Sequence, residues 1–418
     1  MALVPEVAYY ALLEVFVFLA VAELLHPIAQ RAGLPTIVSD LLLGILLSSF
    51  ALGGVLNTLV GVPIFVTNNG YILIFADFSV ILHLFAAGLG GGFSGLRRAG
   101  APAVLAAIVG DLLPFAIVFV ILSRIYPIHA ALLLAVAAAA TSSAVVASLV
   151  RSSGVAGTRG GEFLMNVAAL DDVVALLLLS VVLTTVGGQF DVLAVTGGII
   201  ESVAAWVILL LASVLILPRL LRVPRLRRAQ GMPFLFLFVL VVIVVSLGFS
   251  AVIGAFIAGL AIAESLVATR TRELTDILLL LFGSLFFVVT GAQFDFHQFL
   301  NLDVVAVAGL IALLAAVGKI AGVYPFARWR LGGGPRSGAV ALGMIPRGEI
   351  GLIVGSIGFT SGLLDQQMLG EILLMSIVTT VVGAVLFRRR SPCLTETPAR
   401  APSSTLPSPA TPGPPPPV

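Results

Sequence analysis

The chain has 418 residues, of which 60% are hydrophobic, 10% are charged and 8% are aromatic. This composition lies far outside the range of soluble globular proteins and indicates an all-α polytopic membrane protein. A formal net charge of +2 is too small to indicate a nucleic-acid partner, and the single cysteine, Cys393, excludes a disulfide framework within this sequence.

Thirteen apolar runs, separated by short loops, are each long enough to predict a membrane-spanning helix. They lie at about 5–26, 34–50, 70–90, 101–123, 128–150, 162–187, 197–217, 232–247, 250–268, 277–292, 303–325, 338–358 and 368–387. After Arg390 the sequence is rich in Pro, Ser, Thr and Ala and ends in PGPPPPV. Such a composition buries too little apolar surface to fold, so we predict a disordered cytoplasmic tail over 391–418.

The basic residues predict how these helices are oriented, because cytoplasmic loops carry an excess of Lys and Arg. With the N-terminus outside, the basic residues of the cytoplasmic loops are Arg31, Arg97, Arg98, Arg151, Arg159, Arg219, Arg222, Arg225, Arg227, Arg228, Arg270, Arg272, Arg328, Arg330, Arg336, Arg388, Arg389 and Arg390. The outer loops then hold only Arg124. We therefore predict an external N-terminus and a cytoplasmic C-terminus.

An internal repeat is visible in four short stretches. The sequence GLPTIVSDLLLG at 33–44 aligns with GFSAVIGAFIAG at 248–259, and LFAAG at 84–88 aligns with FVVTG at 287–291. The aligned stretches lie seven predicted helices apart, an odd number, so the second copy would be inverted in the membrane. Predicted helices 1–6 and 8–13 would then be inverted repeats, with helix 7 as the link.

Asp171 and Asp172 lie side by side near the centre of the apolar stretch 161–186. A carboxylate at that depth costs about 3 kcal/mol on insertion scales, so such residues are usually functional. Adjacent helix positions point about 100° apart, so one acid can face a partner in the bundle while the other faces a cavity. A carboxylate binds either a hard cation or a proton. The alternative is two structural acids satisfied by neighbouring hydroxyl groups.

Lys319 is the only lysine of the sequence and lies within a predicted span. Because Lys shifts its pKa readily and Arg does not, this choice suggests that a titratable ammonium is needed. If the repeat is real, the helix of Lys319 runs close to that of Asp171, and the two charges would form a pair. The alternative is a lysine that extends to the cytoplasmic interface near Pro325.

Two predicted spans carry signs of an interruption. The segment 343–351, GMIPRGEIG, places three Gly and one Pro beside Arg347 and Glu349. Its repeat partner is the fifth helix, where Thr141 and Ser142 follow an alanine run. Opposed half-helix ends at the midplane form the ion site of many secondary transporters. Backbone carbonyls and a hydroxyl of Thr141 or Ser142 would complete the oxygen shell of a cation.

Other titratable residues within predicted spans include Asp111 and His83. Asp111 is in the middle of helix four, where it either lines the ion path or is structural, and His83 is expected to be satisfied by packing partners. We find no phosphate-binding loop, no zinc-protease histidine motif and no Ser/His/Asp set. The sequence therefore predicts a protein that is not an enzyme and has no cofactor.

At these residues the sequence resembles the monovalent cation/proton antiporter-2 family and, within it, the bacterial electrogenic sodium/proton antiporters. The matching stretches are GLPTIVSDLLLGILL (33–47), TSSAVVASLV (141–150), NVAALDDVVALLLL (166–179), GAFIAGLAIAES (254–265), LFFVVTGAQFD (285–295), GKIAGV (318–323) and GMIPRGEIGLIVG (343–355). The resemblance implies a homodimer in the bacterial inner membrane, with two crossed broken helices. It also implies a core of helices 4–6 and 11–13 that moves like an elevator.

The resemblance also implies roles for individual residues. Asp172 matches the essential ion-binding aspartate, and Asp171 matches the acid that pairs with a lysine, here Lys319. Thr141 matches the unwound crossing segment and, with the two aspartates, would bind sodium. Finally, Arg347 and Glu349 match the charged pair at the second crossing.

These expectations divide the chain into five parts before the tail. A dimer or scaffold domain would comprise residues 1–100 and 231–300, and a transport core would comprise 101–187 and 301–390, with a linker at 188–230. The expected function is sodium or lithium/proton antiport with two protons per cation. The alternatives are an electroneutral or potassium-preferring exchanger, a sodium-coupled organic-anion symporter, and an intramembrane aspartyl protease, for which adjacent Asp171 and Asp172 are poorly placed.

Overall fold

A computed structural model of the chain describes residues 6–32, 34–66, 69–91, 99–186 and 192–395. Every regular element in these ranges is a helix, as the composition predicts. Nine helices of the described part are long and apolar enough to cross a membrane, or ten if α2 and α3, bent by 43°, count as one span. Each predicted apolar run contains a helix. However, α12 and α13 have only 15 and 13 residues, so helix length does not confirm a count of thirteen.

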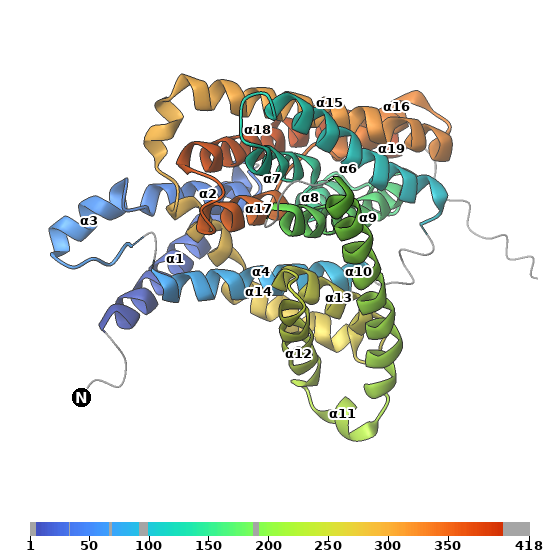
Figure 1. Cartoon of the computed structure of the whole chain (residues 1–418), viewed down its shortest axis with the longest axis horizontal. Coiled ribbons are helices and arrows are strands. Elements are labelled where there is room, and N and C mark those ends of the chain that lie inside the picture. The colour runs from blue at the N-terminus through green and yellow to red at the C-terminus, as the bar shows by residue number, and fades with distance from the viewer. Residues whose placement is uncertain (1–5, 33, 67–68, 92–98, 187–191, 396–418) are drawn as a thin grey trace, which may run out of the picture.

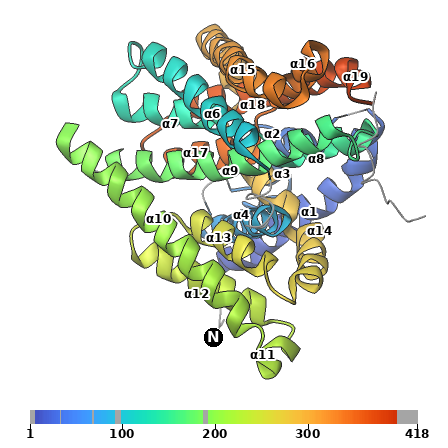
Figure 2. The ribbon, with the colours of Figure 1, turned by 90° about the vertical axis from the view of Figure 1, so that its right-hand side faces the viewer.

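A first group of helices packs mainly within itself, and most of it forms the lower part of Figures 1 and 2, while its members α2 and α3 lie at mid-height. Its members are α1 (Glu6–Arg31), α2 (Thr36–Leu47), α3 (Leu52–Val60), α4 (Gly70–Gly91), α12 (Met232–Ser246), α13 (Ala251–Ala263) and α14 (Ala268–Ala292). The pair α4 with α13 makes its most extensive contacts, followed equally by α14 with α2 and α14 with α4.

A second group lies above α1, α4 and α12–α14 of the first group in both views. Its members are α6 (Ala101–Leu122), α7 (Ile128–Ala139), α8 (Ser143–Ser152), α9 (Arg159–Val186), α15 (Leu302–Leu331), α16 (Gly334–Gly343), α17 (Glu349–Thr360), α18 (Gln366–Arg390) and the short α19 (Pro392–Thr395). The groups are connected by α10 (Val192–Leu220), which packs against α9 and α13, by α11 (Pro224–Arg228), and by the 3-10 helix η1 (Phe296–Leu300).

Four glycines bring the helices of the first group into backbone contact. A β-carbon at Gly44 of α2 would lie 1.9 Å from a carbonyl oxygen of α14, and one at Gly291 of α14 would lie 2.3 Å from a carbonyl oxygen of α2. Gly88 and Gly259 give α4 and α13 the same relationship, with distances of 2.3 and 2.2 Å. These glycines end the four aligned stretches of the predicted repeat. The α2–α14 and α4–α13 crossings are therefore built alike.

We expect a side chain at one of these crossings to destabilise the protein. Gly88→Ala places a methyl group against the backbone of α13, and overpacking of this kind costs about 1–3 kcal/mol. The apparent melting temperature in detergent should therefore fall. Gly309→Ala is the matched control, because a β-carbon at Gly309 of α15 meets open space. Equal melting temperatures for the two variants would contradict this account of the crossing.

The structure corrects three predicted boundaries. The second span does not continue to residue 50, because α2 ends at Leu47 and the chain bends into the separate helix α3. The span predicted to end at 325 continues through Pro325 to Leu331. The tail predicted over 391–418 begins with the helical turn α19, in which Leu394 is buried against α9 and α16. Residues 396–418 lie outside the described part.

Candidate functional site

The two predicted interruptions are present, and they contact each other. The first lies between α7 and α8, and the second lies between α16 and α17. The Ser142 backbone N–H donates to the Pro346 carbonyl at 2.9 Å, and the Thr141 hydroxyl donates to the Met344 carbonyl at 3.2 Å. Pro346 explains the second break, because proline cannot donate a backbone hydrogen bond and disfavours helix before it. No comparable residue signals the first break, where Ser142 caps α8.

Arg347 lies at the C-terminal end of α7, where carbonyl groups lack partners within the helix. Its guanidinium donates to the carbonyl oxygens of Ala139 at 3.0 Å, Ala140 at 3.2 Å and Ala315 at 2.9 Å. Arg347 is completely buried. A fixed cation at this end is favourable, because the aligned peptide dipoles give the C-terminus of a helix partial negative charge.

Glu349 lies at the opposite half-helix end, the N-terminus of α8. Its carboxylate accepts hydrogen bonds from the Ser142 hydroxyl at 2.6 Å, the Ser143 hydroxyl at 3.1 Å and the Ala144 N–H at 3.1 Å. A carboxylate is stabilised there for the converse electrostatic reason. Arg347 and Glu349, the two charges predicted at the second crossing, therefore have different partners. Each neutralises a different end of the other broken helix.

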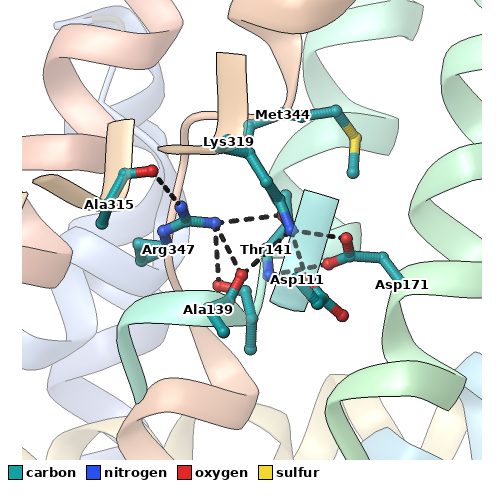
Figure 3. A network of polar contacts seen from close by, with 9 residues as sticks. Asp111, Ala139, Thr141, Asp171, Ala315, Lys319, Met344 and Arg347 are labelled. Carbon is teal, nitrogen blue, oxygen red and sulfur yellow. Dashed lines mark hydrogen bonds and ion pairs between the residues drawn. The ribbon is translucent and has the colours of Figure 1, made fainter. Parts of the chain in front are cut away.

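Lys319 is the centre of a buried network that joins four helices (Figure 3). Its ammonium donates to Asp171 at 2.6 Å, to the Ala139 carbonyl at 2.9 Å and to Asp111. These three bonds use all three ammonium donors. Lys319, Asp111 and Asp171 are each 0% exposed. The predicted contact between Lys319 and Asp171 is present, and the alternative of a lysine extending to the interface is wrong.

Asp111 is the partner that sequence reasoning left undecided. It comes from α6, and its second carboxylate oxygen has no hydrogen-bond partner in the described part of the chain. The second carboxylate oxygen of Asp171 accepts from the Thr141 backbone N–H at 2.9 Å. With Lys319 and Arg347 ionised, the two aspartates are matched by two cations. This balance makes four charges tolerable in one buried region.

Asp172 points elsewhere, into a cavity of about 500 Å³ between the two helix groups. One of its carboxylate oxygens is buried and has no hydrogen-bond partner among the described residues. The neighbouring acids of α9 therefore diverge as the 100° helical rotation predicts. The polar residues lining this cavity are His83, Ser143, Arg151, Asn166, Asp172 and Glu349.

The predicted sodium ligands do not line this cavity together. Of Asp171, Asp172 and Thr141, only Asp172 lines it, and the Thr141 hydroxyl is engaged with Met344 and Arg347. Ser142, also predicted to bind the ion, instead bonds to Glu349 and caps α8. The described residues contain no group of three or more His, Cys, Asp or Glu side chains that could hold a metal ion.

Sequence reasoning missed Ser143 and Asn166 as cavity residues and assigned His83 to packing. A periodic signal was available, because residues spaced three, four or seven apart share one helix face. Met165, Ala168 and Ala169 line the cavity at these spacings before Asp172. The residue types gave no indication, since most of the lining is Ala, Leu and Gly.

Comparisons with known proteins show the family of this chain. Residues 16–388 match the family model described as the transmembrane domain of sodium/hydrogen exchangers. The high-affinity Na⁺/H⁺ antiporter NhaS3 of Synechocystis is 27% identical, covering 91% of this chain and 89% of its own. An Na⁺/H⁺ antiporter of Enterococcus hirae is 25% identical, covering 86% and 93%. The Na⁺/H⁺-K⁺ antiporter GerN of Bacillus cereus is also 25% identical, covering 88% and 93%.

The fold is also similar to a solved structure. The sodium proton antiporter MjNhaP1 of Methanocaldococcus jannaschii, at pH 8, superposes with a TM-score of 0.71 over 93% of this chain and 99% of its own. Its sequence identity is 17%, so this likeness concerns the fold alone. The family match covers most of the chain, and the buried acids and crossed breaks are consistent with it. This chain therefore belongs to the sodium/hydrogen exchanger family of polytopic membrane proteins, whose members are monovalent cation/proton antiporters.

Proposed function

We propose that this protein expels sodium or lithium ions in exchange for protons, with two protons entering for each cation. The observation that carries this proposal is the separation of the two acids. Asp172 lines the cavity, and one of its buried oxygens has no partner among the described residues, whereas Asp171 is sealed with Lys319. One acid thus lies at the cavity wall, and the other belongs to a unit that solvent does not reach.

In this mechanism Asp172 holds either the cation or a proton. A cation at Asp172 lies beside the Asp171–Lys319 unit and disfavours the lysine's positive charge, because like charges repel strongly in a buried site. Lys319 then releases its proton and takes one up again when the cation leaves. The second proton makes each cycle move one net charge. At 100 mV this is worth about 2.3 kcal/mol, so the membrane potential drives export.

Alternating access follows from the position of the cavity between the groups. Its walls come from α4 and α14 of the first group and from α8, α9 and α17 of the second. We take residues 101–187 and 301–390 as a core that moves like an elevator against a dimeric scaffold of 1–100 and 231–300. The equivalent glycine crossings support inverted repeats within thirteen membrane crossings.

The predicted orientation also gives the direction of the cavity. Arg151, in the last turn of α8, lines it and is exposed, and the Arg distribution places that end in the cytoplasm. We therefore assign an inward-facing state to the structure. The protein is placed in a bacterial inner membrane with its N-terminus outside.

Potassium exchange is the second candidate. The name of the relative GerN includes potassium. A carboxylate binds cations of different sizes, so a larger cation is compatible with the same residue.

The remaining alternatives are less compatible with the geometry. An organic anion would meet the carboxylates of Asp172 and Glu349 in the cavity. An aspartyl protease needs two acids open to a peptide, and Asp111 and Asp171 are sealed on either side of Lys319.

Flux measurements on the wild-type protein in proteoliposomes test the proposal. We expect sodium and lithium gradients to drive proton movement in the opposite direction, and an unclamped potential to slow it. Potassium should drive less flux than sodium. Proton flux that is unaffected by clamping the potential would contradict the two-to-one stoichiometry, and the absence of any cation-driven flux would contradict antiport itself.

A further inference from the structure

The cavity that contains Asp172 has a titratable side chain on its opposite wall. The second helix group contributes Asp172, Glu349 and Arg151 to the lining. The first group contributes a stretch of α4 and one residue of α14, and among these described residues only His83 can titrate. The antiport mechanism proposed above makes no use of this imidazole.

The His83 ring is held in one orientation by its neighbours. Its Nδ1 lies 3.0 Å from the Ser79 carbonyl oxygen, one helical turn earlier. The ring packs edge-on against Phe287, with centroids 5.3 Å apart and planes at 85°. It also lies beside Gly283, where a β-carbon would be 3.4 Å from Cε1. Ser79 in turn donates its hydroxyl to the Gly283 carbonyl at 3.2 Å, which fixes α4 against α14.

This orientation determines which nitrogen is free to accept a proton. A carbonyl oxygen can only accept a hydrogen bond, so Nδ1 must carry the proton of the neutral ring. Nε2 therefore carries the lone pair, and no hydrogen bond to it occurs within the described part of the chain. A proton can bind at Nε2 without breaking the bond from Nδ1 to Ser79.

The charges around His83 come from several elements. Across the cavity lie Asp172 on α9, Glu349 on α17 and Arg151 on α8. On the side of His83 itself, α2 carries Asp40, which is bonded to His26. The helix α14 carries Arg272, which is bonded to the Leu89 carbonyl. Glu349, Asp40 and Arg272 are therefore engaged with other groups. Asp172 is the cavity carboxylate with an oxygen that has no hydrogen-bond partner among the described residues, so we take it as the acceptor of a mobile cation.

We propose that His83 is a proton-binding residue of the cation pathway, whose protonation at Nε2 lowers the affinity of Asp172 for sodium. The cavity then holds either an imidazolium or a cation at full affinity. This inference rests on the proposed antiport function, because it takes Asp172 as the cation site. Its consequence is a sodium affinity that weakens in acid more steeply than competition at one carboxylate alone would produce.

Sodium binding tests this assignment without requiring transport. The sodium concentration that half-saturates thermal stabilisation in detergent is measured over a series from pH 5 to pH 8.5 for wild type, H83Q and H83R. At the acid end of this series we expect H83Q to bind sodium up to about tenfold more tightly than wild type, because the positive charge of the protonated imidazole is removed from the wall opposite Asp172. At pH 8.5 the two should agree. H83R carries a fixed charge and should bind sodium more weakly than wild type at pH 8.5.

His129→Gln is the matched control, since His129 lies near the start of α7 and does not line the cavity. If H83Q misfolds, H83L provides the same comparison. A pH dependence in the neutral variants equal to that of wild type would overturn the role of His83. The KM for sodium in proteoliposomes should show the same pattern, with little change in kcat. The sodium affinity could also shift with pH as expected while the wild-type protein shows no sodium/proton exchange. That result would support the role of His83 and would reject the proposed antiport function.

Discussion

Asp172→Asn is expected to reduce sodium-driven proton release to background. A carboxylate about 4 Å from a monovalent cation contributes about 4 kcal/mol at an effective dielectric constant of 20. Its loss therefore weakens cation binding by about three orders of magnitude. Asparagine also removes the group that would carry the proton back. The measurement is proton flux in proteoliposomes driven by a sodium gradient.

The matched control for this variant is Asp77→Asn. Asp77 is also an acid within a candidate membrane span, α4, but it is exposed and does not line the cavity. Its removal should leave exchange within about twofold of wild type, as expected for a surface change away from the site. Sodium-driven exchange retained by the Asp172 variant would reject Asp172 as the ion site.

Lys319→Ala is expected to slow exchange and to make it electroneutral. Without the ammonium, Asp111 and Asp171 are buried carboxylates that have lost their shared partner. Breaking a buried pair in this way costs about 3–5 kcal/mol, so the melting temperature should also fall. The remaining exchange at Asp172 is one proton for one cation and moves no net charge. Transport currents on a supported membrane should therefore disappear while some proton flux persists.

Asp111→Asn separates the charge-carrying role of Lys319 from its effect on stability. This variant keeps the ion pair between Lys319 and Asp171 and removes only the second carboxylate. We expect its transport to remain electrogenic. Undiminished currents in the Lys319 variant would show that the second proton is carried elsewhere.

The buried charges and the break at Pro346 were predictable from the sequence, because each depends on the free-energy cost of placing that residue in a membrane or in a helix. Two acids and a unique lysine in apolar stretches must have compensating partners, whatever the fold. Pro346 interrupts a helix because its ring and missing N–H act within one turn. The interruption before Ser143 has no comparable residue, and it exists because the opposite segment supplies hydrogen bonds to it.

The partners themselves were less predictable. Arg347 and Glu349 are two positions apart, and the resemblance placed both at the second crossing. Their partners in the structure are opposite ends of the other broken helix, more than 200 positions away in sequence. Asp111 is likewise bonded to a residue far away in sequence, Lys319, which is 208 positions from it. Contacts at such separations depend on how whole helices pack, and helix packing is not expressed in local periodicity.

The sequence by itself therefore determined the all-α membrane class, the position of the costly charges and the family resemblance, because hydropathy and burial costs act locally. The resemblance had already paired Asp171 with Lys319 and left Asp172 for the ion, but only the tertiary structure showed the cavity at Asp172 and added Asp111 to the partners of the lysine. It also brought His83 and Asp172 to opposite walls of one space, although they come from different helix groups. A cavity forms where two packed surfaces fail to meet, so its lining is a property of the packing and not of any one helix.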